Sequence, residues 1–148
     1  MGLIYAEVEL INGEDFFLSK KNYIGEEEIR RIPVKMLVDT GSYMLMINEN
    51  IQDVLQLPVV ERRRGVLANG QIVVCDVVSP IELRFKNRRT TCQAMVMPGD
   101  AEPLLGAIPL EDLDVVINAQ RQELIVNPDY PDMASTYLKS TNSLLSPY

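Results

Sequence analysis

Residues 33–42 read Pro33-Val34-Lys35-Met36-Leu37-Val38-Asp39-Thr40-Gly41-Ser42, a mostly apolar run that stops at an Asp-Thr-Gly-Ser turn. Its first part, 34–38, has four apolar residues in five, with a Pro before it and a Gly beyond it, and therefore predicts a buried strand. That strand would carry Asp39 at its tip. Gly41 lets the backbone pass close to a neighbour, and the Thr40 hydroxyl can bond nearby backbone, so the turn should hold the carboxylate in place.

The composition is that of a soluble globular protein with one ordinary domain, since 148 residues include 47% hydrophobic and 24% charged residues. We expect this domain to span residues 1–128. Residues 129–148 lose all periodicity and form a C-terminal tail that could be disordered. A net charge of −7 argues against nucleic acid as a partner, and the basic clusters at 62–64 and 88–89 are more typical of charged strand edges than of anion sites. No stretch has the pattern of a signal peptide or a membrane span, so we expect a cytoplasmic protein without a membrane partner.

Histidine is absent from the sequence, and this excludes several kinds of chemistry at once. Ser-His-Asp and Cys-His catalysis, His-ligated zinc and a His general base all need that residue. Acid-base chemistry would therefore fall to carboxylates, Lys or Tyr. Cys75 and Cys92 are seventeen residues apart in apolar contexts, so they predict buried, reduced, structural thiols and no zinc or redox site. We expect neither a metal nor another cofactor.

Periodicity and turn residues predict an all-β fold with one or two short helices. A helix should begin after Asn48 and run over 49–55 with Ile51, Val54 and Leu55 on one face, and a second should cover 108–113. Asn69-Gly70 is a strong hairpin signal. Residues 12–15 should form a turn, and 16–31 an extended hairpin or mobile insertion. The strands are expected at 3–11, 34–38, 43–47, 72–78, 81–85, 90–97, 115–117 and 123–126, with a break at Ser79-Pro80 and a loop over 98–103.

Apolar residues followed by Asp39-Thr40-Gly41-Ser42 resemble the active-site loop of aspartic proteases, in particular of the retropepsin-like branch. Two further matches follow in the order that this family has. The predicted hairpin at 66–72 corresponds to the flap, and Leu104-Leu105-Gly106 before a helix corresponds to the segment that packs beside the catalytic loop. Ala107-Ile108 stands where viral members carry an Arg and an acid, so the sequence is more similar to the microbial, non-viral members.

The resemblance implies a single-domain closed β-barrel that pairs as a two-fold homodimer and hydrolyses peptide bonds in a peptide or protein substrate. The chain has no second Asp-Thr-Gly or Asp-Ser-Gly, so it is not a two-lobed, pepsin-like enzyme. By this resemblance Asp39 would be catalytic, Thr40 and Gly41 would order the active-site loop together with Ser42, and the partner copy would supply the second Asp. The remaining implied residues are those of the flap tip, Leu67, Ala68, Asn69 and Gly70, and those that support the loop, Leu104, Leu105 and Gly106.

Two other interpretations stay open at the level of sequence. The chain could keep the fold without activity and bind peptides or a protein partner in the cleft. It could also be a small β interaction protein, of the toxin-antitoxin kind for example, in which the Asp-Thr-Gly arose by chance. A dimer that Asp39→Asn inactivates without unfolding would favour the protease, and a stable monomer that binds peptides would favour the binding module.

Overall fold

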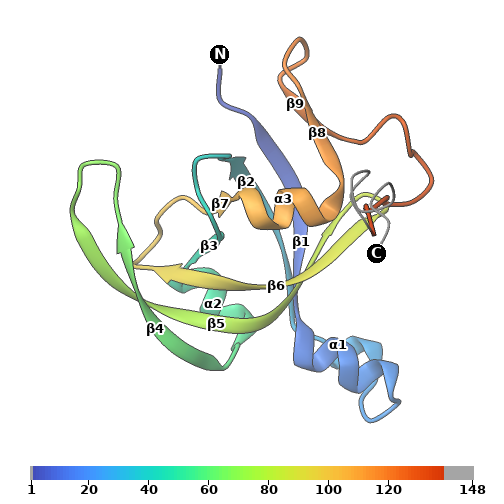
Figure 1. Ribbon diagram of the computed structural model, residues 1–148. Helices are drawn as coiled ribbons and strands as arrows, with labels where there is room; N and C mark the ends of the chain where they lie inside the picture. Colours follow the sequence, from blue (N-terminus) through green and yellow to red (C-terminus); the bar gives the residue numbers. More distant parts are fainter. Residues whose placement is uncertain (1, 139–148) are drawn as a thin grey trace, which may run out of the picture.

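The computed structural model of this chain describes residues 2–138, and within that range it is built mainly of β-strands (Figure 1). The mainly β, single-domain fold class is thereby confirmed. No helix in this range has the length and apolar character needed to span a membrane. In chain order the elements are β1 (Tyr5–Asn12), α1 (Gly13–Lys20), the 3₁₀ helix η1 (Glu26–Glu28), β2 (Arg31–Val38), β3 (Leu45–Asn48), α2 (Glu49–Leu55), β4 (Val59–Val66), β5 (Ile72–Phe85), β6 (Arg88–Met97), β7 (Leu104–Leu105), α3 (Ala107–Leu113), β8 (Val115–Asn118) and β9 (Glu123–Val126).

Seven of these strands form one sheet in the order β1-β2-β7-β3-β6-β5-β4, and β1 also pairs with β5. Hydrogen bonding therefore runs from β1 through five other strands and returns to β1, while β4 extends beyond β5. Strands β8 and β9 form a separate antiparallel pair. In Figure 1 the β4–β5 hairpin projects to the left, away from the strands that surround the core.

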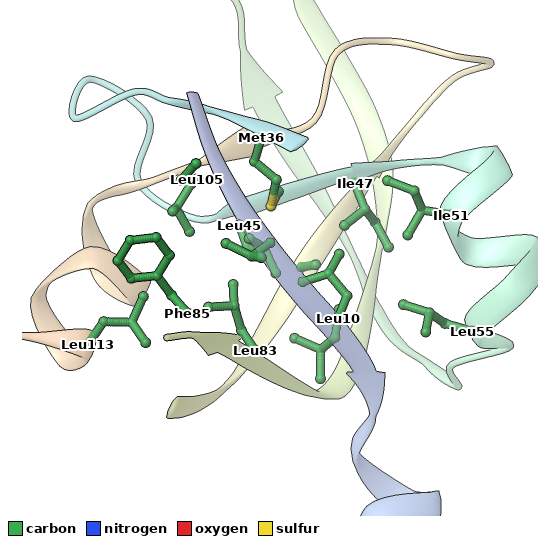
Figure 2. Close-up of a cluster of buried hydrophobic side chains, with 14 of the residues drawn as sticks. Leu10, Met36, Leu45, Ile47, Ile51, Leu55, Leu83, Phe85, Leu105 and Leu113 are labelled. Atoms are coloured by element: carbon green, nitrogen blue, oxygen red, sulfur yellow. The ribbon is translucent and has the colours of Figure 1, made fainter. Parts of the chain in front are cut away.

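The core lies between strands and helices that all present apolar side chains inward. Ile4, just before β1, and the alternate residues Ala6, Val8 and Leu10 on β1 are at most 5% exposed, so the predicted period of two is confirmed. Figure 2 shows the side chains that meet them from the other elements. The labelled ones are Met36 on β2, Leu45 and Ile47 on β3, Ile51 and Leu55 on α2, Leu83 and Phe85 on β5, Leu105 on β7 and Leu113 on α3.

Helix α2 begins where the sequence predicts, because Asn48 caps it. The Asn48 side chain accepts a hydrogen bond from the Ile51 N–H at 2.9 Å, which satisfies one of the free donors of the first turn. Ile51 and Leu55 are buried, but Val54 is 43% exposed. The prediction for the helix is confirmed, and the placement of Val54 on its buried face is wrong.

The prediction of a turn at 12–15 is wrong, and of the two alternatives for 16–31 the extended hairpin is wrong, because α1 and η1 occupy this region. Asn12 caps α1 by accepting a hydrogen bond from the Asp15 N–H at 3.0 Å. Asp15 is itself buried and receives two hydrogen bonds from the Arg30 guanidinium, at 2.8 and 2.9 Å. The capping residue and the acidic first turn were local signals for a helix, whereas the link to Arg30 joins residues too far apart to be read from the sequence. The chain thus has three α-helices in its described part, one more than predicted.

The predicted break at Ser79-Pro80 is also wrong, since β5 continues through it. The pairing of β5 with β6 shifts register between Val78 and Ile81. A proline cannot donate to a ladder, and one extra residue on β5 at this point lets the pairing resume beyond it. The predicted strands at 90–97, 115–117 and 123–126 and the helix at 108–113 are confirmed within one or two residues.

Beyond β9 the chain continues over the turn between β5 and β6. Arg88 is 2% exposed and donates to the Tyr130 carbonyl at 2.6 Å, and the Asn87 side chain donates to the Pro131 carbonyl at 2.8 Å. The Ser135 N–H donates to the Asp114 carboxylate at 2.9 Å. The predicted tail therefore begins with a segment that is bonded to the domain, and its residues 139–148, with the Leu144-Leu145 pair, lie outside the described residues.

The buried carboxylate of Glu82 leads to a prediction about stability. Burial raises the pKa of Glu82, but hydrogen bonds from Arg89 at 2.6 and 2.7 Å and from Thr91 at 2.9 Å, with the charges of Arg89 and Arg84, outweigh this and lower the pKa below 4.5. A lowered carboxyl pKa stabilises the fold above the unfolded-state value and ceases to do so as pH falls through the folded value. Glu82→Gln should therefore cost about 2 kcal/mol at neutral pH, because the neutral amide loses the charge-assisted hydrogen bonds that the buried carboxylate accepts from Arg89.

The measurement is urea denaturation of the native protein and of Glu82→Gln at neutral pH and at several pH values below 4.5. The difference in free energy of unfolding between native protein and variant should shrink as pH falls in that window. Glu7→Gln, at an exposed position of β1, is the control and should change little at any pH. A difference that stays constant with pH would show that the charge of Glu82 does not stabilise the fold.

Candidate active site

The Asp39 loop is anchored by β7, which lies beside the end of β2 in parallel. Val38 pairs with Leu105, and the Asp39 N–H donates to the Leu105 carbonyl at 3.0 Å. The Ser42 N–H donates to the Asp39 carbonyl at 3.1 Å and closes the turn. The Gly41 N–H donates to Asp39 Oδ1 at 3.0 Å, so the carboxylate is oriented by a backbone amide two residues on. Asp39 remains partly exposed, and its charge is therefore accessible to solvent.

Gly106 brings the start of α3 against the same loop. The Ala107 N–H donates to the Ser42 carbonyl at 2.8 Å, and the Ile108 N–H donates to the Tyr43 carbonyl at 3.1 Å. These are N–H groups of the first turn of α3, which have no partner inside the helix. A Cβ at Gly106 would lie 2.2 Å from the Met44 carbonyl oxygen, so only glycine permits this approach.

The hairpin at 66–72 is formed as predicted, between β4 and β5. The Leu67 N–H donates to the Gln71 carbonyl and the Gly70 N–H to the Leu67 carbonyl, both at 2.8 Å. Gly70 has a φ of +84°, which glycine adopts without strain, and Asn69 accepts from the Gln71 N–H at 2.9 Å. Ala68, Asn69 and Gly70 are exposed at the tip, while Leu67 is partly buried.

A cleft of about 320 Å³ lies between the base of this hairpin and the Asp39 loop, and we call it the methionine cleft. It brings together Gly41 and Ser42 from the loop with Leu67 from the hairpin, three of the residues that the resemblance implies for the site. The other predicted residues do not line the cleft. Asp39 and Thr40 lie beside it, next to Gly41 in the chain. The hairpin tip holds Ala68, Asn69 and Gly70, and the segment that supports the Asp39 loop holds Leu104, Leu105 and Gly106. The full lining is Gly41, Ser42, Tyr43, Met44, Met46, Arg63, Arg64, Gly65, Val66, Leu67, Val73, Met95 and Met97.

Comparison with known families agrees with this geometry. Residues 25–108 match a family described as aspartyl protease, and this match covers more than half of the chain. The chain belongs to the aspartyl protease family. The comparison with curated proteins gives no match. The matched range includes the Asp39 loop, the hairpin and Gly106, so the resemblance read from the sequence is confirmed at the level of the family.

The sequence interpretation of this aspartyl protease missed the methionines. Four of the seven in the chain, Met44, Met46, Met95 and Met97, line the cleft. Met44 lies just before β3 and Met46 lies on it, while Met95 and Met97 lie on β6. The spacing of two residues in each pair places the methionines on one face, because the neighbouring residues Leu45 and Ala94 are buried in the core on the other face. The parallel pairing of Met46 with Met95 then brings the two sets together. The alternation was visible in the sequence, but the pairing of two strands so far apart was not.

The two thiols take no part in the candidate site of the aspartyl protease. Both are free, Cys75 being buried and Cys92 partly exposed. Burial raises the pKa of Cys75, and burial together with the nearby charges of Asp112 and Glu82 raises the pKa of Cys92 to about 12. Neither is therefore a thiolate nucleophile near neutral pH. Within residues 2–138, no three His, Cys, Asp or Glu side chains gather in a group that could hold a metal ion.

Proposed function

We propose that this aspartyl protease is a homodimeric endopeptidase in which Asp39 from each of two copies activates one water molecule. The observation that carries the proposal is the Asp39 loop itself: its carboxylate is oriented by the Gly41 N–H and its backbone by Leu105, beside a cleft that the hairpin base covers. The return of hydrogen bonding from β5 to β1 supports the closed β-barrel of the retropepsin type. We take residues 1–128 as the catalytic domain.

A single Asp39 cannot perform both proton transfers of peptide hydrolysis. Two carboxyl groups within a few ångströms of each other share one proton, because two charges at that distance are costly; this is the known arrangement of aspartic proteases. The charged carboxylate takes a proton from water as the oxygen attacks the peptide carbonyl. The protonated one assists the carbonyl, and a proton then passes to the leaving amine as the C–N bond breaks.

In a homodimer with a two-fold axis between the two Asp39 loops, the second copy of the chain would supply the second carboxylate. Isologous dimers of this kind are the commonest oligomers. Thr40 is exposed at the surface of the loop, where it would contact the loop of the partner copy. The hairpin tip, with Leu67, Ala68, Asn69 and Gly70, would close over a peptide and bind its backbone as an added strand. Leu104, Leu105 and Gly106 would keep the loop in place beneath it.

The test is digestion of a mixture of denatured proteins at acidic and neutral pH, with new peptide ends identified by mass spectrometry. We expect cleavage, fastest at acidic pH where one carboxyl of the pair is protonated. Activity per molecule should fall on dilution in step with dissociation of the dimer, measured by analytical ultracentrifugation. A folded dimer that cuts nothing at any pH would favour the binding module, and a monomer that cuts at full rate would contradict the shared site.

A further inference from the structure

The methionine cleft has a lining of unusual chemistry for its position beside the catalytic loop. Its floor consists of the four methionines Met44, Met46, Met95 and Met97, with Val73 beside them. Met is unbranched and polarisable, and its side chain adapts to the shape of an apolar partner. A floor of this kind accommodates a long, unbranched apolar side chain better than a rigid branched one.

Gly65 determines how much room the cleft has under the hairpin. It lies on β4 opposite Val73, and its missing side chain faces the cleft. A Cβ at this position would lie 3.4 Å from Met95 Cε and 3.6 Å from Val73 Cγ2, which is ordinary contact, so the backbone here tolerates a Cβ, and the atoms of a larger side chain would occupy space in the cleft. Glycine is otherwise unfavourable inside a strand. Its presence here keeps the cleft deep.

The charged residues of the lining are all basic. Among the described residues that line the cleft, Arg63 and Arg64 are charged and none is acidic. Arg63 forms an ion pair with Glu61 and donates to Met44 Sδ at 3.1 Å, so its guanidinium is fixed at the wall of the cleft. A further positive charge brought into this space would lose its hydration and would find no acidic partner in the lining. The cleft therefore discriminates against Lys, although Lys has the length that the cleft accepts.

We infer that the methionine cleft binds one long, unbranched, uncharged side chain of an extended substrate peptide, of the size of methionine or norleucine, and that Gly65 sets its depth. The inference rests on the proposed function for the peptide nature of the ligand. The cleft is continuous with the candidate active site, because Gly41 and Ser42 line it. A peptide strand that passes Asp39 under the hairpin thus places one of its side chains in this space.

The test measures binding separately from cleavage. Asp39→Asn protein with ¹³C-labelled methionine methyl groups is titrated with hexapeptides of Ala and Ser that carry norleucine at one position in turn, and the methyl signals are followed by NMR. Matched peptides carry Lys or Ala at the same position. We expect norleucine at one position to shift the signals of the four cleft methionines and to bind about tenfold more tightly than Lys or Ala.

A second variant tests the role of Gly65. Gly65→Val in the same protein should weaken binding of the norleucine peptide about tenfold and leave that of the Ala peptide within about twofold. Val60→Ala, on an exposed position of the same strand, is the control and should alter neither. If Gly65→Val proves unfolded by circular dichroism, the comparison of norleucine with Lys in the parent protein still decides the question.

The results of these experiments distinguish the inference about the methionine cleft from the proposed protease function. Equal binding of norleucine, Lys and Ala peptides, shifts confined to methionines outside the cleft, or no binding up to about 5 mM would overturn the inference. Cleavage of peptides by the native protein without preference for norleucine over Lys would overturn it too and leave the protease proposal intact. Selective binding in the cleft with no cleavage by the native protein would overturn the proposed function and support the inference.

Discussion

Asparagine at position 39 should lower the rate of peptide cleavage by at least about a thousandfold, because removal of an essential catalytic group has an effect of this order or larger. The amide has the size of the carboxylate and keeps an oxygen that can accept from the Gly41 N–H. It cannot take a proton from water. The free energy of unfolding should therefore stay close to that of the native protein, and both quantities are measured, by a peptide cleavage assay and by urea denaturation.

Mixing native and Asp39→Asn subunits tests whether both copies of a dimer must carry Asp39 for the dimer to be active. When an equal amount of Asp39→Asn protein is added and subunits exchange freely, about half of the original activity should remain, because half of the native subunits then sit in mixed dimers. Activity that does not change on mixing would contradict a site made from two copies. Asp53→Asn, at an exposed position of α2, is the matched control and should retain full activity.

Alanine at position 106 should destabilise the protein by about 3 kcal/mol or more, because its methyl group would overlap with backbone carbonyl groups of the Asp39 loop region. The Cβ would lie 2.2 Å from the Met44 carbonyl oxygen and 2.8 Å from the Ser42 carbonyl oxygen, and the Ser42 carbonyl is the acceptor of the Ala107 N–H that holds the loop. Activity should fall together with stability, because the same loop carries Asp39. Urea denaturation and the cleavage assay measure the two effects.

Gly70→Ala is the control for this variant. Its φ of +84° makes alanine strained, but no atom lies within 4 Å of the added Cβ, so the cost should be about 1 kcal/mol. Gly106→Ala should therefore be clearly the less stable of the two. Equal stability of the two variants would contradict the close approach of α3 to the loop.

What the sequence allowed us to predict is what depends on neighbours in the chain. Asn48 capping, the Asn69-Gly70 turn and the alternation of β1 need only a few consecutive residues. The Asp39 loop and Leu104-Leu105-Gly106 were found as separate motifs through the family resemblance. The structure adds that they are joined by the parallel pairing of β2 with β7.

What the sequence did not reveal depends on residues that are far apart. Helix α1 is held by the pair of Asp15 with Arg30, and the methionine cleft exists only because β3 pairs in parallel with β6. Its lining residue Gly65 lies on β4, a strand that we did not predict from the sequence. The continuity of β5 through Pro80 was missed for a different reason: a local breaker was compensated by a shift in register with another strand.

The anchoring of the Asp39 loop by residues 105–108 also has a consequence for the order of events during synthesis. The Leu105 carbonyl and the Ala107 and Ile108 amides that hold the loop follow it in the chain, so they emerge from the ribosome after it. Because a domain folds as a unit, the nascent chain carries Asp39 on an unanchored segment until residues 105–108 are available. Assembly of the Asp39 loop thus waits until residues 105–108 have been made.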